Sequence, residues 1–237
     1  MTKTLSLWRR GLRWLIISLC LLLALSIVLP VSMAWWNPPT WSWRIMRALD
    51  PPANFPAQVQ HQWVPLEQIS PNMQLAVIAA EDQLFFHHRG FDWQSIEQAR
   101  ATAAAGGRVR GASTLSQQTS KNLFLTPSRS MLRKGLEAWL TFWLELACSK
   151  ERILELYLNI VEFGPGIYGV EAAAQHYFQR PASQLTLRQA AQLAAILPNP
   201  YRFSVHQLSQ HTLNRVTWIE RQMRQLGPNH IPKRNQP

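Results

Sequence analysis

The fold is decided by residues 130–161, which read SMLRKGLEAWLTFWLELACSKERILELYLNIV. Ser130 and Ser149 can each cap a helix, because a serine side chain at that position accepts a hydrogen bond from the free backbone N–H groups of the first turn. Apolar residues recur at helical spacing after each serine. The stretch therefore predicts two consecutive helices, 130–148 and 150–161.

Helical patterns continue on both sides of this pair. Towards the N-terminus they predict helices at 72–84 and at 92–105, the second capped by Asp92, and a third helix that Ser113 caps after a Gly-rich basic loop at 106–111. Towards the C-terminus the sequence predicts a turn at Gly164-Pro165-Gly166 and helices at 168–178, 187–197 and 210–226. No strand signal of comparable strength competes, so a mainly α domain is expected.

Residues 14–36 carry no charge, and about 20 apolar residues are enough to cross a hydrocarbon core of about 30 Å. This segment predicts a transmembrane helix. The positive-inside rule places residues 1–13 in the cytoplasm and the rest of the chain on the outer side of the membrane. The basic residues that precede the segment are Lys3, Arg9, Arg10 and Arg13, and the tryptophans expected to form an interfacial belt after it are Trp35, Trp36, Trp41 and Trp43.

A cleaved signal peptide is the alternative for this segment, since Ser32-Met33-Ala34 loosely fits a cleavage site. The apolar run is long for a signal, and a Trp pair suits a membrane interface better. Six prolines in 37–65 predict a juxtamembrane linker without regular structure. Residues 66–227 would form one domain, and the polar tail 228–237 is expected to be disordered.

The composition limits the possible partners. The chain has 237 residues, of which 47% are apolar, and 24 Lys+Arg against 13 Asp+Glu give a net charge of +11. Such a charge favours an anionic partner, and export across a membrane argues against nucleic acid. Cys20 lies in the membrane segment, which leaves Cys148 without a disulfide partner and most simply as a buried helix residue. No zinc-ligand spacing, phosphate loop or dinucleotide fingerprint supports a metal or nucleotide cofactor.

Residues 79–90 read AAEDQLFFHHRG and place two adjacent acids at the end of an apolar helical run. Apolar neighbours one turn away could desolvate Glu81 or Asp82 and raise its proton affinity. The alternative is that both acids only end a helix and accept hydrogen bonds. For His87 and His88, a hydrogen-bonded structural role near the acids is favoured over metal binding.

Two more polar patterns stand out. Residues 111–122, GASTLSQQTSKN, open a helix with hydroxyls and amides, and a helix N-terminus attracts anions, although an ordinary capped helix fits equally well. A second stripe recurs every four residues along the helix at 130–148. Because most other positions there are apolar, we expect a helix buried on most sides whose polar stripe faces a cleft, with a solvated edge as the alternative. The stripe consists of Arg129, Arg133, Glu137, Thr141 and Glu145.

Five motifs, in order along residues 75–205, resemble those of the glycosyltransferase family that polymerises the glycan strands of bacterial peptidoglycan. The resemblance is close to its membrane-anchored single-domain members, the monofunctional biosynthetic transglycosylases. Ala112 departs from the glycine that is common at that position. The motifs are Glu81-Asp82-x-x-Phe85-x-x-His88-x-Gly90; Gly111-x-Ser113-Thr114-Leu115-x-Gln117-Gln118-x-x-Lys121-Asn122; Arg133-Lys134-x-x-Glu137; Lys150-x-x-Ile153-Leu154-Glu155-x-Tyr157-Leu158-Asn159; and Gly166-x-Tyr168-Gly169-Val170-x-x-Ala173-Ala174-x-x-Tyr177-Phe178.

This resemblance implies a lysozyme-like, two-lobed helical domain and a polymerase reaction. The sugar 4-hydroxyl of lipid II would attack the anomeric carbon of a growing strand held by undecaprenyl pyrophosphate, with inversion and formation of a β-1,4 bond. Glu81 would be the general base. Glu137 would be the second essential acid, and three roles stay open for it: orienting cations, tuning Glu81, or helping to hold a divalent ion such as Mg²⁺ or Mn²⁺. No other cofactor is implied.

The resemblance also assigns binding residues. Lys121 and Arg129 would contact the pyrophosphate, while Arg133 and Lys134 would add positive field or structure. Lys150 would contact the acceptor phosphates, and Asp82, His88 and Gly90 would support the site. The residues expected to shape the sugar and phosphate site are Ser113, Thr114, Gln117, Gln118 and Asn122.

Two other functions stay open on the sequence. A lysozyme-like hydrolase or lytic transglycosylase would share the fold, although an uncharged glycan needs no cations around its acids. A non-catalytic membrane-anchored scaffold would use the basic surface to bind anionic lipid or an envelope partner. The resemblance implies that the enzyme lies in the cytoplasmic (inner) membrane with its domain on the periplasmic side. Its expected partners are lipid II, the growing lipid-linked glycan strand, the membrane and other cell-wall synthesis proteins, one of which would have to supply cross-linking.

Overall fold

Helices make up most of the computed structural model, which describes residues 2–52, 55–107, 111, 113–128, 130–227 and 230–231, without the side chains of residues 2–7. The mainly α prediction is confirmed. The helices are α1 Thr2–Ser32, α2 Ser42–Leu49, α3 Pro71–Glu81, α4 Trp93–Ala104, α5 Leu115–Phe124, α6 Met131–Ala147, α7 Lys150–Ile160, α8 Val170–Phe178, α9 Leu187–Ile196 and α10 Gln210–Leu226, with 3-10 turns η1 Leu66–Gln68 and η2 Ala182–Gln184.

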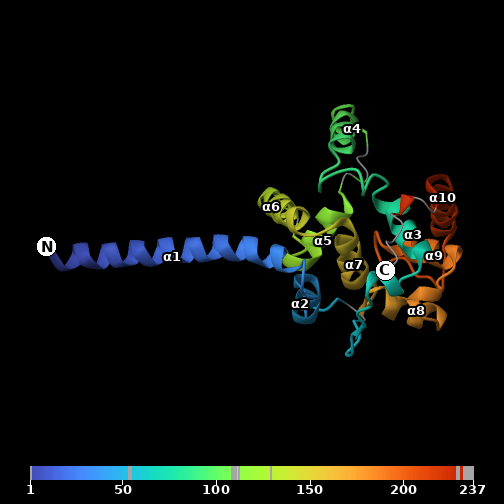
Figure 1. Cartoon of the computed structure of the whole chain (residues 1–237), viewed down its shortest axis with the longest axis horizontal. Helices are drawn as coiled ribbons and strands as arrows, with labels where there is room; N and C mark the ends of the chain where they lie inside the picture. Colours follow the sequence, from blue (N-terminus) through green and yellow to red (C-terminus); the bar gives the residue numbers. More distant parts are fainter. Residues whose placement is uncertain are drawn as a thin grey trace, which may run out of the picture.

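The helices pack in two groups. In one group α5 packs against α6 and α7, close to the end of α1; in the other α3, α9 and α10 pack against one another. Figure 1 shows α1 as a long rod that leaves the domain beside α2, α5 and α6, whereas α8, α9 and α10 lie at the far end. This arrangement agrees with the expected two-lobed domain on one N-terminal helix.

Most helix starts follow the predicted caps. The side chains of Asp92, Ser130 and Ser149 accept hydrogen bonds from the first turns of α4, α6 and α7. The cap of α5 is Thr114, one residue after the predicted Ser113, because Gln117 stands three residues later and completes a capping box with it.

A small sheet was not predicted. Its strands β1 Gln60–His61, β2 Glu162–Gly164 and β3 Ile167–Tyr168 run in the order β1-β3-β2, with β1 parallel and β2 antiparallel to β3. The predicted turn at residues 164–166 is the connection between β2 and β3. Strands of two or three residues are too short to show an alternating pattern in the sequence.

The N-terminal helix fits a single-pass membrane anchor. Within the residues that the structure describes, Trp8–Ser32 is the one helical stretch long and apolar enough to cross a membrane. Its far end is held by the domain: Arg152 of α7 donates from Nε to the Met33 carbonyl oxygen at 2.8 Å, and from Nη2 to the Trp36 carbonyl oxygen at 2.9 Å. These are carbonyls that a helix end leaves without intrahelical partners.

The expectation of an irregular linker at 37–65 is wrong for its central part, which contains α2 and β1. The prolines gather before and after residues 40–50, so they leave the eight residues of α2 free to form a helix. Trp41 is only 2% exposed and meets the rings of His61 and Tyr168 edge to face, so it belongs to the core and not to an interfacial belt. Trp35 and Trp36, in contrast, are 71% and 68% exposed.

The orientation expected for α6 is also wrong. Its polar stripe is the buried side, where Glu137 and Thr141 are at most 2% exposed, and its apolar side is open. Periodicity shows that a helix has a polar and an apolar face, but it does not show whether each face contacts protein, water or lipid. An exposed apolar face beside a membrane helix is typical of a surface that contacts lipid. The exposed apolar residues are Met131, Leu132, Leu136, Trp139, Phe142 and Leu146.

Candidate active site

A pocket of about 390 Å³ lies where the end of α3, the side of α4, the start of α5 and the face of α10 meet. Glu81 and Asp82 enter it from α3, Ser95 from α4 and Trp218 from α10, and Thr114 forms part of the wall before α5. The acids singled out in the sequence therefore line a cavity whose size is typical of small-molecule sites.

Glu81 is the last residue of α3, and its carboxylate is held from two sides. Oε2 accepts a hydrogen bond from Gln118 Nε2 at 3.1 Å, and Oε1 accepts one from Arg215 Nη2 at 3.1 Å. Burial raises the pKa of Glu81, while Gln118, Arg215 and Lys121 act in the opposite direction. The side chain is still 16% exposed, so this carboxylate is oriented, reachable and raised in proton affinity.

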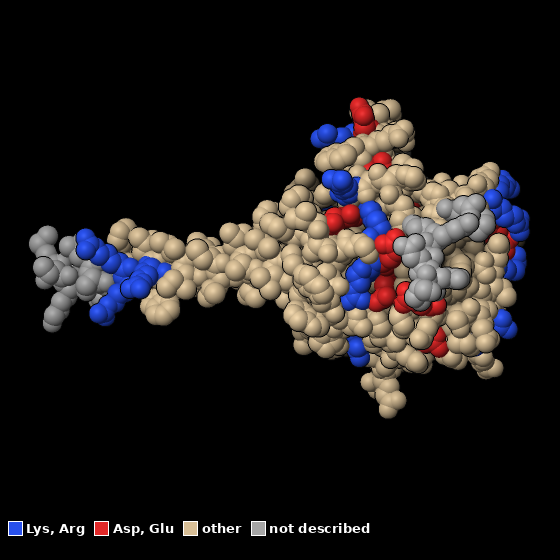
Figure 2. Space-filling model, viewed as in Figure 1, with Lys and Arg blue, Asp and Glu red and all other residues tan. Residues whose placement is uncertain are grey.

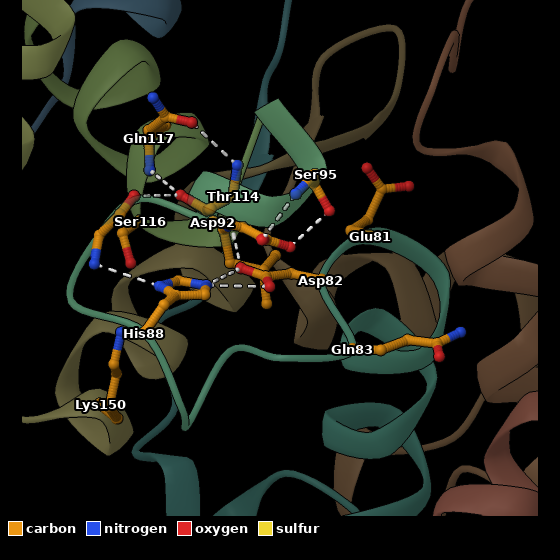
Figure 3. Close-up of polar contacts among 12 residues, drawn as sticks. Glu81, Asp82, Gln83, His88, Asp92, Ser95, Thr114, Ser116, Gln117 and Lys150 are labelled. Carbon is orange, nitrogen blue, oxygen red and sulfur yellow. Dashed lines mark hydrogen bonds and ion pairs between the residues drawn. The ribbon is translucent and has the colours of Figure 1, made fainter. Parts of the chain in front are cut away.

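Asp82 points away from Glu81 and towards the start of α5 (Figure 3). Its oxygens both lie 3.0 Å from His88 Nε2, and Oδ2 accepts a hydrogen bond from the backbone N–H of Leu115 at 2.9 Å. The Gly90 N–H donates to His88 Nδ1, which leaves Nε2 as the nitrogen that carries the proton towards Asp82. Two adjacent acids thus have different surroundings, and Asp82 joins the end of α3 to the first turn of α5.

Thr114, Gln117 and Gly90 form the frame around this junction. Thr114 Oγ1 donates to the Gly90 carbonyl oxygen at 2.7 Å, and Gln117 Oε1 accepts from the Thr114 N–H at 3.0 Å. Gly90 has a φ of +86°, and a Cβ there would lie 3.0 Å from side-chain atoms of Thr141 and Glu145. The structure therefore places Thr114 and Gln117 in backbone hydrogen bonds of the frame, while Gln118 faces Glu81.

A cluster of charges on α6 lies beside α5. Glu137, 2% exposed, accepts hydrogen bonds from Arg133 Nη1 at 2.6 Å and from Lys134 Nζ. Lys134 Nζ also lies 3.5 Å from Ser113 Oγ, which brings the start of α5 into the same cluster. Arg129, expected to contact pyrophosphate, lies outside the described residues.

Lys121 is the cation of this region whose charge is least compensated. Its Nζ lies 5.2 Å from the ring centroid of Trp43, and among the described residues no carboxylate is within ion-pair distance of it. Burial lowers its pKa, while Glu137 and, to a smaller extent, Glu81 oppose that shift. An ammonium within electrostatic range of both acids but paired with neither is suited to bind an anion.

Lys150 and Asn122 are placed differently from the expectation. Lys150 Nζ pairs with Glu145 Oε1 at 2.6 Å and lies 4.7 Å from the ring centroid of Phe85, in a contact network that also includes the hydroxyl of Ser116. This ion pair engages the ammonium of Lys150, the first residue of α7, so that the ammonium is not free to bind a phosphate. Asn122 is buried on α5, 8% exposed.

The residues present do not fit a divalent ion at Glu137. Both of its oxygens already accept from cations, and the described part of the chain has no group of three or more His, Cys, Asp or Glu that could hold a metal ion. Glu137 instead has the contacts of an acid that orients two neighbouring cations.

Arg215 is the functional candidate that the sequence did not suggest. It comes from α10, 134 positions after Glu81, and the predicted helix 210–226 matches α10 in both bounds. The local pattern of α10 marks its apolar face but gives no sign that one of its arginines reaches α3. Only the packing of α10 on α3 and α9 creates the contact.

Comparison with known proteins shows the family of the chain. A family model described as Transglycosylase matches residues 50–224. A "Biosynthetic peptidoglycan transglycosylase" of Shewanella amazonensis is 56% identical over 220 residues, 93% of this chain and 89% of the relative. Proteins of the same name from Aeromonas hydrophila (57% over 219 residues, 91% and 93%) and Shewanella oneidensis (54% over 228 residues, 96% and 97%) are similar over most of their length. The chain therefore belongs to the biosynthetic peptidoglycan transglycosylases.

Proposed function

We propose that this transglycosylase extends glycan strands from lipid II. The 4-hydroxyl of the acceptor sugar attacks the anomeric carbon of the strand, and its proton passes to Glu81. The bond from the anomeric carbon to the pyrophosphate oxygen breaks, and undecaprenyl pyrophosphate leaves with the electron pair. The anomeric centre is inverted and a β-1,4 bond forms.

The observation that carries this proposal is the environment of Glu81. A general base works best when its pKa is not far below the working pH, and burial moves the pKa of Glu81 in that direction. Gln118 and Arg215 hold the two oxygens in fixed directions beside the pocket. Asp82 is less accessible, because its side chain is 3% exposed against 16% for Glu81 and its oxygens accept hydrogen bonds from His88 and the Leu115 N–H.

The cations beside α5 suit the leaving group. A pyrophosphate needs positive charge and not a proton as it departs, and preorganised cations stabilise such developing charge most effectively. Lys121 offers an ammonium that has no carboxylate partner in the described part of the chain, while Glu137 holds Arg133 and Lys134 in place beside it. Arg129 stays a prediction for the same role. A hydrolase acting on an uncharged glycan would gain nothing from this arrangement.

The exposed apolar face of α6 supports work at a membrane surface. Trp139 Nε1 donates to Ser26 Oγ at 3.0 Å, and Ser26 lies six residues before the end of α1, about 9 Å along the helix axis. Because Ser26 lies well inside the apolar stretch Trp8–Ser32, Trp139 would lie within the hydrocarbon core. Figure 2 shows basic residues near the free end of α1 and an uncharged length between them and the domain, as expected for an N-terminus in the cytoplasm.

The test uses the full chain in detergent or bilayers with labelled lipid II. The wild-type protein should form polymer and release undecaprenyl pyrophosphate, and Glu81→Gln should abolish both while lipid II still binds. Glu97→Gln, an exposed acid on α4, is the matched control and should keep full activity. Undiminished polymerisation by Glu81→Gln would refute the assigned base. Shortening of preformed strands would instead support a hydrolase, and binding without either reaction would support a scaffold.

A further inference from the structure

A second pocket, also of about 390 Å³, lies where the end of α1 meets α2 and the last turn of α5. The residues 38–42 that connect α1 to α2 complete its wall, and no Asp, Glu, Lys or Arg lines it. Its shape and chemistry suit a hydrocarbon chain. The apolar residues that carry the argument are Leu29, Met33, Trp41, Ile45, Leu123 and Phe124.

Two apolar residues of this pocket are exposed beside the membrane helix. Leu29 belongs to the apolar stretch Trp8–Ser32 and is 46% exposed on its surface, and Ile45 of α2 is 43% exposed on the opposite wall. Trp35 and Trp36, which are exposed at the same end of α1, are residues that prefer the interface between hydrocarbon and water. A lipid chain can therefore enter the pocket from the bilayer without crossing water.

The pocket also lies close to Lys121, the cation proposed to bind the pyrophosphate. Leu123 and Phe124 follow Lys121 on α5 by two and three residues, a rise of about 3 and 4.5 Å along the helix. Trp43, whose ring lies 5.2 Å from Lys121 Nζ, stands on α2 between the pocket residues Ser42 and Ile45. One amphiphile could therefore place an anion at Lys121 and an apolar chain in the pocket.

We propose that this pocket binds the first isoprene units of the polyprenyl chain on the donor pyrophosphate, an inference that rests on the proposed function. A polyprenyl chain is bonded directly to its pyrophosphate, which matches a pocket that begins one helical turn from Lys121. A phospholipid separates its phosphate from its acyl chains by a glycerol ester. Its chains would start too far from Lys121 to fill the same space while its phosphate binds there. The pocket thus anchors the donor while its anomeric carbon reacts beside Glu81.

The experiment measures the binding of farnesyl pyrophosphate and of inorganic pyrophosphate to the full chain in detergent by calorimetry. We expect farnesyl pyrophosphate to bind at least about tenfold more tightly, because part of its chain leaves water. Ile45→Trp should fill the pocket and reduce this preference to about threefold or less, while the affinity for inorganic pyrophosphate stays unchanged. Leu49→Trp is the matched control, since Leu49 is exposed on the same helix but outside the pocket, and it should keep the preference.

Thr40→Trp, at a second exposed position of the wall, should repeat the result of Ile45→Trp. The proposal is overturned if the wild-type protein shows no preference for the prenyl compound, or if both filling variants retain it. Native mass spectrometry tests for a phospholipid in the pocket. The proposal is also overturned if the wild-type protein carries a bound phospholipid, and the filling variants lose this phospholipid but retain the preference for farnesyl pyrophosphate. If both filling variants lose the preference but Glu81→Gln still polymerises lipid II, the pocket proposal stands and the proposed base is refuted.

Discussion

Replacing Arg215 by Gln should change how the polymerisation rate depends on pH. The guanidinium of Arg215 lies 3.1 Å from the Glu81 carboxylate and stabilises its ionised form. Burial already raises the pKa of Glu81, and Arg215 is one of the groups that oppose this shift. Without the positive charge the ionised form is less stable, so the pKa of Glu81 rises further and this proposed base becomes protonated at a higher pH.

The size of the effect follows from distance and exposure. An opposite charge this close shifts a carboxyl pKa by about 1–3 units, but the Arg215 side chain is 29% exposed and water screens it. We therefore expect a shift of about one unit, or about 1.4 kcal/mol between the two protonation states. On the acidic side of the profile the rate should fall about tenfold, and above the new pKa it should approach that of the wild-type protein.

The assay is the initial rate at saturating lipid II over the pH range in which the protein stays folded. The acidic limb of this profile reports the pKa of the base in the enzyme–substrate complex. Arg221→Gln, an exposed arginine on the same helix, is the control and should leave the limb in place. A uniform loss of rate at every pH with an unmoved limb would refute the reasoning, and so would a shift of the limb to lower pH.

Three further predictions concern stability and membrane depth. Asp82→Ala should lower the free energy of unfolding by about 2 kcal/mol, because His88 and the Leu115 N–H lose a charged acceptor, and denaturant titration should show a smaller loss for Glu81→Ala. Equal losses would contradict the different roles of the two acids. Gly90→Ala should cost about 1–3 kcal/mol in the same titration because of its positive φ, and a neutral result would show that the loop adapts. A spin label on Leu132→Cys should be accessible to oxygen in bilayers, whereas one on Arg188→Cys should be accessible to a water-soluble relaxant; identical accessibilities would place α6 outside the membrane.

Local rules predicted much of the fold. Helix caps at Asp92, Ser130 and Ser149 were found because a cap depends on a side chain and the three residues after it. The helix in the proline-rich segment was missed because a proline count ignores where the prolines stand. The buried polar side of α6 was missed because a two-faced pattern is the same in water and in lipid.

The site was less predictable than the fold. Glu81 and Asp82 are neighbours with similar apolar surroundings in the sequence, so local reasoning could not separate them. Their difference comes from distant partners: Gln118 and Arg215 for one acid, Leu115 for the other. The resemblance to a family pointed to Glu81, but the contact with Arg215 depends on how α10 packs and has no local signal.

The clamp between Arg152 and the end of α1 has a mechanical consequence. Met33 and Trp36 offer their carbonyls to one guanidinium from α7, which also pairs with Glu155 of the same helix. The anchor is thus joined to the domain by a rigid connection and not by a flexible linker. Such a joint fixes the height of the catalytic pocket above the bilayer. In the proposed reaction, a lipid-borne donor would then meet the site at one level, and the lengthening strand, not the enzyme, would have to slide between successive additions.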